Sequence, residues 1–338
     1  MKLSLKTLSV LLLFGSIISC KKEDTPTVTP ITKPPSDTIS TTSTYGVILR
    51  TPEARFKDLK DYNFQENYVF LEGTDKLRMH YIDEGKTNKK VILLLHGNPS
   101  WVYNFRKIVP LLVAKGYRVI APDLIGFGKS DKPASRAVIT YENQVAWMET
   151  FVKKMNIADI NLHVQDWGGL IGLRVALKNK SLFSKIAISN TSLPDGSSVT
   201  PAFRAWRTSS QSVPNYSNVM EQATFRELSV EEETAYDAPF PEERFKAAPR
   251  EMPLKVPITA NDPEGIKNAA FNKDFALWNI PIVTIFSEMD NISAGEDVKI
   301  QQFLGAKGQP HTIVKEASHF IREDQPQVMT DLLSSFFK

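Results

Sequence analysis

The stretch Ile160-Asn161-Leu162-His163-Val164-Gln165-Asp166-Trp167-Gly168-Gly169 decides the fold of this chain. An apolar run ends at Val164 and a helical pattern begins at Gly168, so Asp166 lies at a sharp turn from a strand to a helix. Such a turn needs small residues because the backbone passes close to its neighbours, and it lifts one side chain into a pocket. Here the lifted side chain is a carboxylate.

Apolar segments rich in Val, Ile and Leu recur on both sides of this turn and alternate with helical patterns. The alternation predicts an α/β protein with a mostly parallel, doubly wound sheet of eight strands. Residues 91–95 are apolar without alternation, as expected for a strand covered on both faces. The predicted strands are 68–71, 77–82, 91–95, 119–122, 160–164, 186–189, 282–286 and 312–314, and the main predicted helices are 103–115, 142–155, 168–178 and 325–337.

The alternation is interrupted over residues 191–275, where Pro, Glu and aromatic residues crowd into short helical patterns. We predict that this insertion is a helical cap. It would cover a site at the carboxyl ends of the strands, where open α/β sheets bind ligands. The core domain would then comprise residues 45–190 and 276–338.

The first twenty residues are typical of an export signal. Lys2 and Lys6 precede an apolar run that is too short to span a bilayer comfortably. The run ends in Ile-Ile-Ser-Cys, which resembles the bacterial lipobox, and Cys20 is the only cysteine in the chain. We therefore predict a lipoprotein signal peptide over residues 1–20 with lipid attached at Cys20. A plain signal peptide with an accidental cysteine is the alternative.

Residues 21–44 are rich in Thr, Pro, Ser and Lys, and they contain too few apolar residues to offset the entropy of ordering. We predict that they form a disordered tether. The protein would then be held to a membrane through the lipid at Cys20, in the bacterial cell envelope. The residues that follow Cys20 are Lys21 and Lys22, and they do not form an acidic retention signal. This favours the outer membrane as the location of the anchored protein.

The charge balance excludes some classes of partner. The 41 Lys and Arg residues nearly match the 38 Asp and Glu residues, so no broad cationic field for nucleic acid is expected. No spacing of His, Cys, Asp and Glu is typical of a metal site, and no Gly-rich phosphate loop is present. We expect no cofactor and no metal.

Three side chains follow three different predicted strands in the order nucleophile, acid, histidine: Asp166, Asp290 and His319. A carboxylate that attacks a saturated carbon forms an ester, which water can break; a serine would leave a stable ether. His319 would take a proton from that water, and Asp290 would orient and stabilise the histidine. The structural alternative for Asp166 is a helix N-cap.

A second turn, His96-Gly97-Asn98-Pro99-Ser100-Trp101, follows the third predicted strand. The backbone N–H groups of Asn98 and Trp167 are the predicted oxyanion donors, because this position and the residue after the nucleophile supply them in such folds.

These motifs, together with residues 121–133, resemble the haloalkane dehalogenases of the α/β-hydrolase fold, over nearly all of the chain after Tyr45. The resemblance implies hydrolysis of small apolar alkyl halides to an alcohol and a halide ion. It implies that the Trp167 indole binds the leaving halide. The second halide donor in the family is either a cap tryptophan, here Trp206, or the asparagine that matches Asn98. A purely structural packing role is the alternative for Trp206.

Two other functions stay open at this point. An epoxide hydrolase would use the same Asp nucleophile with tyrosine donors from the cap, for which Tyr216 and Tyr236 are available. A surface lipoprotein that binds ligands without turnover would need only the fold.

Overall fold

The structure is a computed structural model, and it describes residues 38–40, 45–71 and 77–338. The predicted signal peptide, Cys20 and most of the predicted tether lie outside these ranges. All described residues belong to one compact unit. No helix among them is long and apolar enough to cross a membrane.

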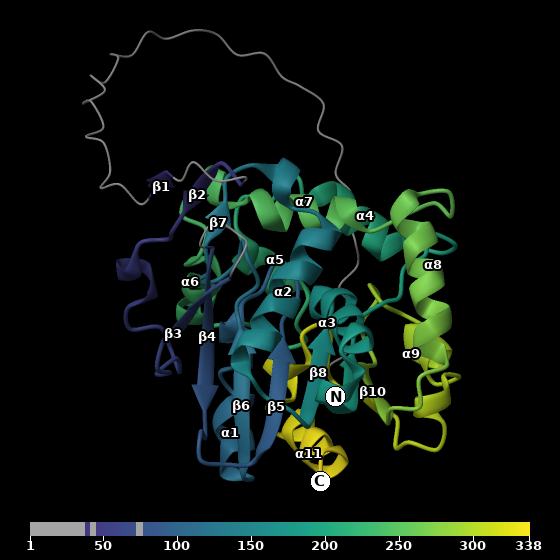
Figure 1. Ribbon diagram of the computed structural model, residues 1–338. Coiled ribbons are helices and arrows are strands. Elements are labelled where there is room, and N and C mark those ends of the chain that lie inside the picture. The colour runs from purple at the N-terminus through teal and green to yellow at the C-terminus, as the bar shows by residue number, and fades with distance from the viewer. Residues whose placement is uncertain (1–37, 41–44, 72–76) are drawn as a thin grey trace, which may run out of the picture. The chain divides into compact units, whose positions relative to one another are not determined.

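An eight-stranded sheet forms the centre of this unit, which confirms the predicted fold class. Figure 1 shows β4, β6, β5, β8 and β10 side by side across it. Strands β6, β5, β8, β9, β10 and β11 run parallel, whereas β4 and β3 are antiparallel to their neighbours. In sheet order the strands are β11 (Thr312–Val314), β10 (Ile282–Ser287), β9 (Phe183–Ser189), β8 (Ile160–Gln165), β5 (Lys90–Leu95), β6 (Tyr117–Pro122), β4 (Arg78–Glu84) and β3 (Asn67–Phe70).

The side chains of β5 enter two separate cores, one on each face of the sheet. Leu93 and Leu95 belong to one apolar cluster, and Ile92 and Leu94 belong to the other. This is the reason for the uninterrupted apolar run in β5, because a strand covered on both faces has no solvent-facing side. The same burial places the carboxyl end of β5 and the following turn inside the molecule.

Helices cover both faces of the sheet. Apolar residues of α2 (Tyr141–Met155) and α3 (Trp167–Lys178) pack in one core, and those of α1 (Ile108–Ala114) and α11 (Pro326–Phe336) pack in the other. The predicted helix 103–115 is divided into a 3-10 turn over Val102–Phe105 and α1. Pro110 has no N–H donor and is tolerated only near a helix start, which favours a new start just before it.

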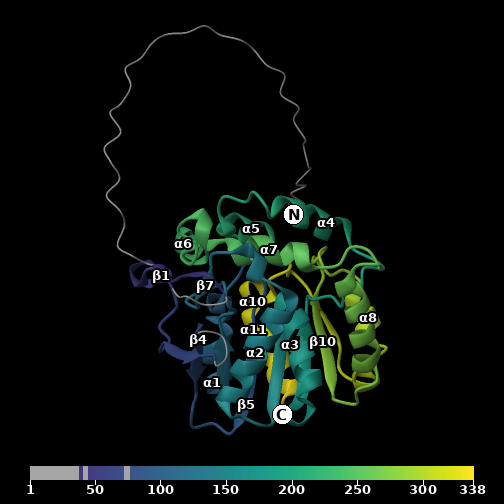
Figure 2. The same cartoon turned by 45° about the horizontal axis from the view of Figure 1, so that its top comes forward.

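The predicted cap lies between β9 and β10. Helices α4 (Pro201–Ser209), α5 (Tyr216–Gln222), α6 (Val230–Asp237) and α7 (Ala247–Lys255) gather at one end of the unit (Figure 2). The last helix of the predicted cap range is α8 (Pro263–Ala276), which contacts the core. Arg174 of α3 hydrogen-bonds Glu264 and Asn268 of α8. We therefore group α8 with the core helices.

A small sheet is an addition that the sequence pattern did not predict. It contains β1 (Thr38–Ser40), β2 (Val47–Leu49) and β7 (Lys132–Pro133). The predicted tether runs to residue 44, so the strand at 38–40 differs from that prediction. Pairing with β2 satisfies backbone groups that would otherwise need water, which is a reason for a polar segment to become ordered.

Candidate active site

Asp166 stands at the end of β8 in a backbone conformation that few residues adopt. Its φ is 51° and its ψ is −126°, which costs on the order of 1–3 kcal/mol for a residue with a side chain. The Asp166 N–H donates to the Asn190 carbonyl at 3.0 Å, and the Thr191 hydroxyl donates to the Asp166 carbonyl at 2.7 Å. A Cβ on Gly168 would lie 2.2 Å from the Leu95 carbonyl oxygen, so only glycine fits there. The close approach of the β5 backbone therefore requires glycine at position 168 in this turn.

The turn after β5 approaches Asp166 from the other side. The Asn98 backbone N–H donates to Asp166 Oδ1 at 2.7 Å, and a Cβ on Gly97 would lie 2.4 Å from the Asp166 Cβ. His96 holds this turn, because its Nδ1 lies 2.9 Å from the Gly97 carbonyl and its Nε2 accepts from the Leu124 N–H at 2.9 Å. One predicted oxyanion donor is thus in place. The other, the Trp167 N–H, is in the first turn of α3, where helix N–H groups lack intrahelical acceptors.

The structure brings the three predicted catalytic side chains together. His319 Nδ1 lies 3.0 Å from Asp290 Oδ1, and His319 Nε2 lies 3.8 Å from Asp166 Oδ2. Asp290 also accepts from the Ile292 N–H at 2.9 Å and from Ser293. The acid and the histidine are buried, so Asp290 is fixed by four donors in a place from which water is largely excluded.

The electrostatics of the pair follow from this geometry. Burial by itself raises the pKa of Asp290, but the facing His319 and the hydrogen bonds from Ser293 and Ile292 lower it to about 2. Burial by itself lowers the pKa of His319, but the Asp290 and Asp166 carboxylates raise it to about 10. The two carboxylates therefore favour the protonated ring of His319 as long as both are charged.

Two further side chains hold His319, and the motif analysis assigned them no role. The Asn190 amide donates to the carbonyls of Ser318 and His319 at 3.1 and 3.0 Å. Gln165 Nε2 lies 2.8 Å from His319 Nε2 and 3.3 Å from the His319 carbonyl. Gln165 is the last residue of β8 and Asn190 directly follows β9, but nothing in the sequence around them marks them as partners of His319.

A cavity of about 360 Å³ opens onto Asp166 and His319. Asn98 and Trp206 both line it, together with apolar groups of α4, α5 and the loop after β10. The Asn98 side-chain amide donates to the Pro249 carbonyl of α7 at 3.1 Å, whereas the described residues offer no hydrogen-bond partner to the Trp206 indole. Trp167 is not part of the lining; it is 3% exposed and packs against Tyr141 with ring centroids 5.3 Å apart.

The two cap tyrosines that an epoxide hydrolase would need are outside the cavity lining. The Tyr236 hydroxyl is bound to Glu323 and accepts from Asn104 at 3.0 Å. Tyr216 is buried against Phe240, with ring centroids 4.9 Å apart. Neither hydroxyl is placed to protonate a ligand held at Asp166.

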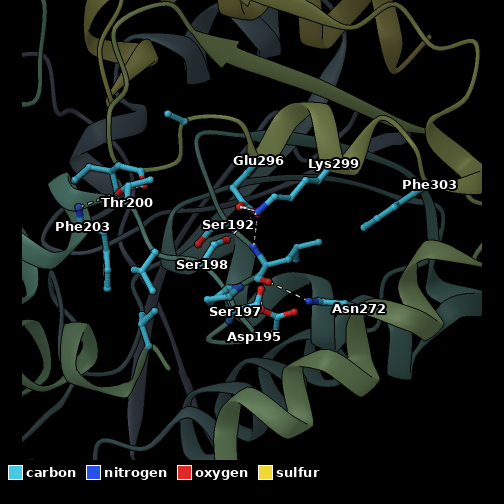
Figure 3. A pocket seen from close by; sticks show the side chains of 16 residues that line it. Ser192, Asp195, Ser197, Ser198, Thr200, Phe203, Asn272, Glu296, Lys299 and Phe303 are labelled. Carbon is cyan, nitrogen blue, oxygen red and sulfur yellow. Dashed lines mark hydrogen bonds and ion pairs between the residues drawn. The ribbon is translucent and has the colours of Figure 1, made fainter. Parts of the chain in front are cut away.

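A second cavity, of about 450 Å³, is lined by residues that follow β9, among them Ser192 and Asp195, and by Glu296 and Lys299 (Figure 3). Its charged groups are paired within the protein, Lys299 with Glu296 at 2.5 Å and Asp195 with the Ser197 N–H at 2.9 Å. The Asn272 amide nitrogen donates to the Leu193 carbonyl at 3.0 Å, whereas its Oδ1 is buried without a partner among the described residues. This cavity contains none of the three catalytic side chains, so we place the active site in the smaller cavity. Within the described ranges, no group of acidic, His and Cys side chains could hold a metal ion.

Comparisons with known proteins agree with this site. Residues 90–240 match the family model of the α/β hydrolase fold. A haloalkane dehalogenase of Psychrobacter cryohalolentis is 43% identical over 295 residues, which cover 86% of this chain and 97% of the relative. One of Mycobacterium marinum is 40% identical, with coverage of 85% and 99%. The solved structure of a haloalkane dehalogenase from Paraglaciecola agarilytica has a TM-score of 0.77 at 31% identity, over 86% of this chain and 97% of that one.

Proposed function

This chain belongs to the haloalkane dehalogenase family and hydrolyses carbon–halogen bonds, and we propose that Asp166, His319 and Asp290 perform the reaction through a covalent ester. One observation carries the assignment of roles. The Asn98 N–H occupies Asp166 Oδ1, so Oδ2 is the carboxylate oxygen that remains to attack. That same oxygen is the one near His319.

In the first step Asp166 Oδ2 attacks the carbon that bears the halogen. A carbon–oxygen bond forms, the carbon–halogen bond breaks, and the halide departs with the bonding electrons. The apolar wall of the cavity suits an alkyl chain. No proton moves in this step, so it does not require a neutral histidine.

The departing halide needs hydrogen-bond donors, because its charge develops in an apolar cavity. We propose that the Trp167 and Trp206 indoles supply them. Support for Trp206 is its place in the lining and its N–H, which lacks a partner among the described residues. The Asn98 amide nitrogen already donates to Pro249, so Asn98 is the weaker candidate for a halide donor.

In the second step water attacks the ester carbon of Asp166. His319 Nε2 takes the proton, the Asn98 and Trp167 N–H groups stabilise the oxyanion, and the alcohol leaves. Esterification removes the Asp166 charge, which is one of the two charges that raise the pKa of His319. The pKa of His319 therefore falls, and more of the ring is in the neutral form that can accept a proton at the stage that needs it. When the tetrahedral intermediate breaks down, its hydroxyl proton passes to the departing alkoxide, which restores the Asp166 carboxylate, and the proton on His319 passes to solvent.

A His319→Ala variant tests the covalent mechanism. Incubation with a short bromoalkane should release one bromide per protein molecule and leave an alkyl adduct on Asp166, visible as a mass increase. His311 is outside the site, so His311→Ala is the matched control, and it should turn over without a trapped adduct. A His319→Ala variant that releases bromide without any adduct would rule out the ester. Diol formation from an epoxide, without bromide release by the parent, would favour the alternative enzyme.

We also propose that lipid at Cys20 anchors the protein in the bacterial cell envelope, at the outer membrane. The support is in the sequence: a short charged and apolar leader, a lipobox-like end and a single cysteine. Radiolabelled palmitate should be incorporated into the full chain but not into a Cys20→Ser variant, and only the labelled form should fractionate with outer membranes. Equal labelling of both forms would exclude the anchor.

A further inference from the structure

Gln165 lies between the catalytic histidine and a buried arginine. It is the last residue of β8, directly before Asp166, and its side chain is inaccessible to solvent. Its Nε2 faces His319 Nε2 at 2.8 Å, and its Oε1 accepts from Arg322 Nη2 at 2.9 Å. Arg322 is in the short helix α10 (Ile321–Asp324), which follows His319. The Gln165 and Arg322 side chains therefore connect α10 to the turn between β8 and α3 that carries Asp166.

The chemistry of Arg322 sets the direction of the Gln165 amide. A guanidinium has only donors, so the amide group that faces it has to be the oxygen. The amide nitrogen is then turned to His319, where it meets the Nε2 lone pair of a neutral ring. With the opposite orientation, two donors would face each other at Arg322. This hydrogen bond is available only when His319 Nε2 carries no proton.

Arg322 is a buried cation without an ion-pair partner. It has no accessible surface, and no carboxylate of the described residues lies within 4.0 Å of its nitrogens. Its Nε donates to Asn104 Oδ1 at 2.9 Å, and its guanidinium lies 4.9 Å from the Phe105 ring centroid. Burial lowers the pKa of Arg322 to about 10, so the group keeps its charge at neutral pH.

Several other ionisable groups lie near His319 and Arg322. Asp290 and Asp166 face His319. Besides Asp166, the acidic groups whose charges act on Arg322 are Glu323 and the Tyr236 hydroxyl. The Glu323 charge is already matched by three cations, Arg106, Arg226 and Lys107. The two remaining buried imidazoles near Arg322 belong to His96 and His163, and burial lowers the pKa of each.

We propose that Arg322 is a positioning residue that acts through Gln165 to favour the form of His319 in which Nε2 carries no proton. Two effects work in the same direction. The Gln165 N–H stabilises the unprotonated nitrogen, and the Arg322 charge disfavours an imidazolium nearby. Both oppose the two carboxylates that favour the protonated ring.

This effect on the protonation of His319 matters in the second step of the reaction, the hydrolysis of the ester. In the ester only Asp290 still attracts the proton, and Arg322 with Gln165 would bring the histidine toward the neutral form that activates water. The kinetic part of this inference rests on the proposed function. The acid–base part concerns His319 alone and can be measured without turnover.

The first experiment measures the His319 pKa by ¹⁵N NMR in a full-length Asp166→Ala variant, which removes the same charge as the ester does. Adding Arg322→Gln should raise the pKa by about one unit, because a glutamine lets the Gln165 amide reverse and removes the cation. Adding Arg322→Lys, which keeps a charged donor, should change it by less than about 0.3 units. An unchanged pKa with Arg322→Gln, or equal shifts with both, overturns the proposal.

One measurement needs no change at Arg322. In the Asp166→Ala protein above the His319 pKa, a scalar coupling should connect the Gln165 and His319 Nε2 nuclei across their N–H···N hydrogen bond. Its absence in a folded protein overturns the proposed orientation. Gln165→Glu, which exchanges the donor for a carboxylate of the same shape, should raise the His319 pKa further than Arg322→Gln does, and a lowered pKa would contradict the mechanism.

The second experiment follows ester formation and decay by rapid quench and mass spectrometry with a bromoalkane at pH 7. Arg322→Gln should slow ester hydrolysis about tenfold and move its acidic limb about one pH unit upward, with the bromide burst within about twofold of the parent. Arg322→Lys should restore the parent profile. Arg118 pairs with Asp83 away from the site, so Arg118→Gln is the matched control. A parent without any burst would refute the proposed function while leaving the NMR result valid.

Discussion

The active-site cavity has a core wall, which carries Asp166, Asp290 and His319, and a cap wall, which carries Trp206 of α4. The two walls differ in how firmly their side chains are held. On the core wall, Asp290 and His319 are buried and fixed by several hydrogen bonds, and the Asp166 backbone is locked by Asn190 and Thr191. On the cap wall, α4 contains no fully buried residue. Trp206 is only half-buried, and its indole has no partner among the described residues.

The difference separates the tasks of the two walls. Groups that meet developing charge act best when they are already oriented, because reorganisation then adds nothing to the barrier. The core wall has that property. The cap wall determines mainly which alkyl chain fits, and that task tolerates movement. We therefore expect substitutions on the core wall to abolish or slow single chemical steps, and those on the cap wall to change apparent affinity.

The largest effect is expected for Asp166→Ala. Without the attacking carboxylate no ester can form, so bromide release should fall on the order of 10⁴-fold or more. Asp195 is a carboxylate of the second cavity, and Asp195→Ala should retain near-parental release. The measurement is bromide release from a bromoalkane under saturating conditions. Residual activity within tenfold of the parent would show that Asp166 is not the nucleophile.

Asp290→Asn should affect one half-reaction only. The asparagine keeps the shape but leaves the imidazolium without its carboxylate, so ester hydrolysis should slow by about 10²- to 10⁴-fold. The bromide burst should keep an amplitude close to one per protein molecule, because alkylation needs no base. Quench-flow mass spectrometry should show the ester accumulating. Equal slowing of the burst and of ester decay would contradict the division of roles.

Substitution of Trp167 and of Trp206 tests the difference between the core wall and the cap wall directly. Trp167→Phe removes a donor that the core holds rigidly and should lower kcat/KM for a bromoalkane by about 100-fold. Trp206→Phe removes a donor on the exposed helix and should lower it by about tenfold, with bromide inhibition weakened as well. Trp278 is outside the cavity, and Trp278→Phe serves as the control. A larger loss with Trp206→Phe would reverse the comparison.

The smallest effect is expected in stability. The folded-state pKa of His319 is raised to about 10, so the protonated ring stabilises the fold fully below its unfolded pKa of about 6.5. This contribution should disappear as pH rises from about 6.5 to 10. The Tm advantage of the parent over His319→Gln should therefore shrink by roughly 2–6 °C across that interval. A Tm difference that stays constant or grows with pH would oppose the prediction.

The sequence predicted the parts of the fold that depend on local patterns. All eight strands of the main sheet were placed within three residues of their observed starts. The clearest case is β5, because a parallel strand that is buried on both faces is apolar without alternation. Asp166 was recognised through its place between a strand and a helix. The small sheet was not predicted, since β7 is only two residues long and exists through its pairing with β2.

For the candidate site, too, some features could be predicted from the sequence and others could not. The order of Asp166, Asp290 and His319 along the chain was sufficient to predict that they meet, because carboxyl ends of parallel strands lie at one edge of the sheet. Nothing local marked Gln165 or Asn190 as partners of His319. Their contacts join residues more than 100 positions apart in the chain, and only packing determines them.

The sequence by itself therefore predicted the α/β-hydrolase architecture, the carboxylate at the turn after β8 and the chemistry open to it, because these depend on residue type and on short-range periodicity. The tertiary structure alone decided which oxygen of Asp166 lies near His319, which tryptophan lines the cavity, and which buried cation lies behind Gln165. Those properties are distances of a few ångströms between segments that the chain order separates widely. The side chains of both cores fix these distances only when they pack together.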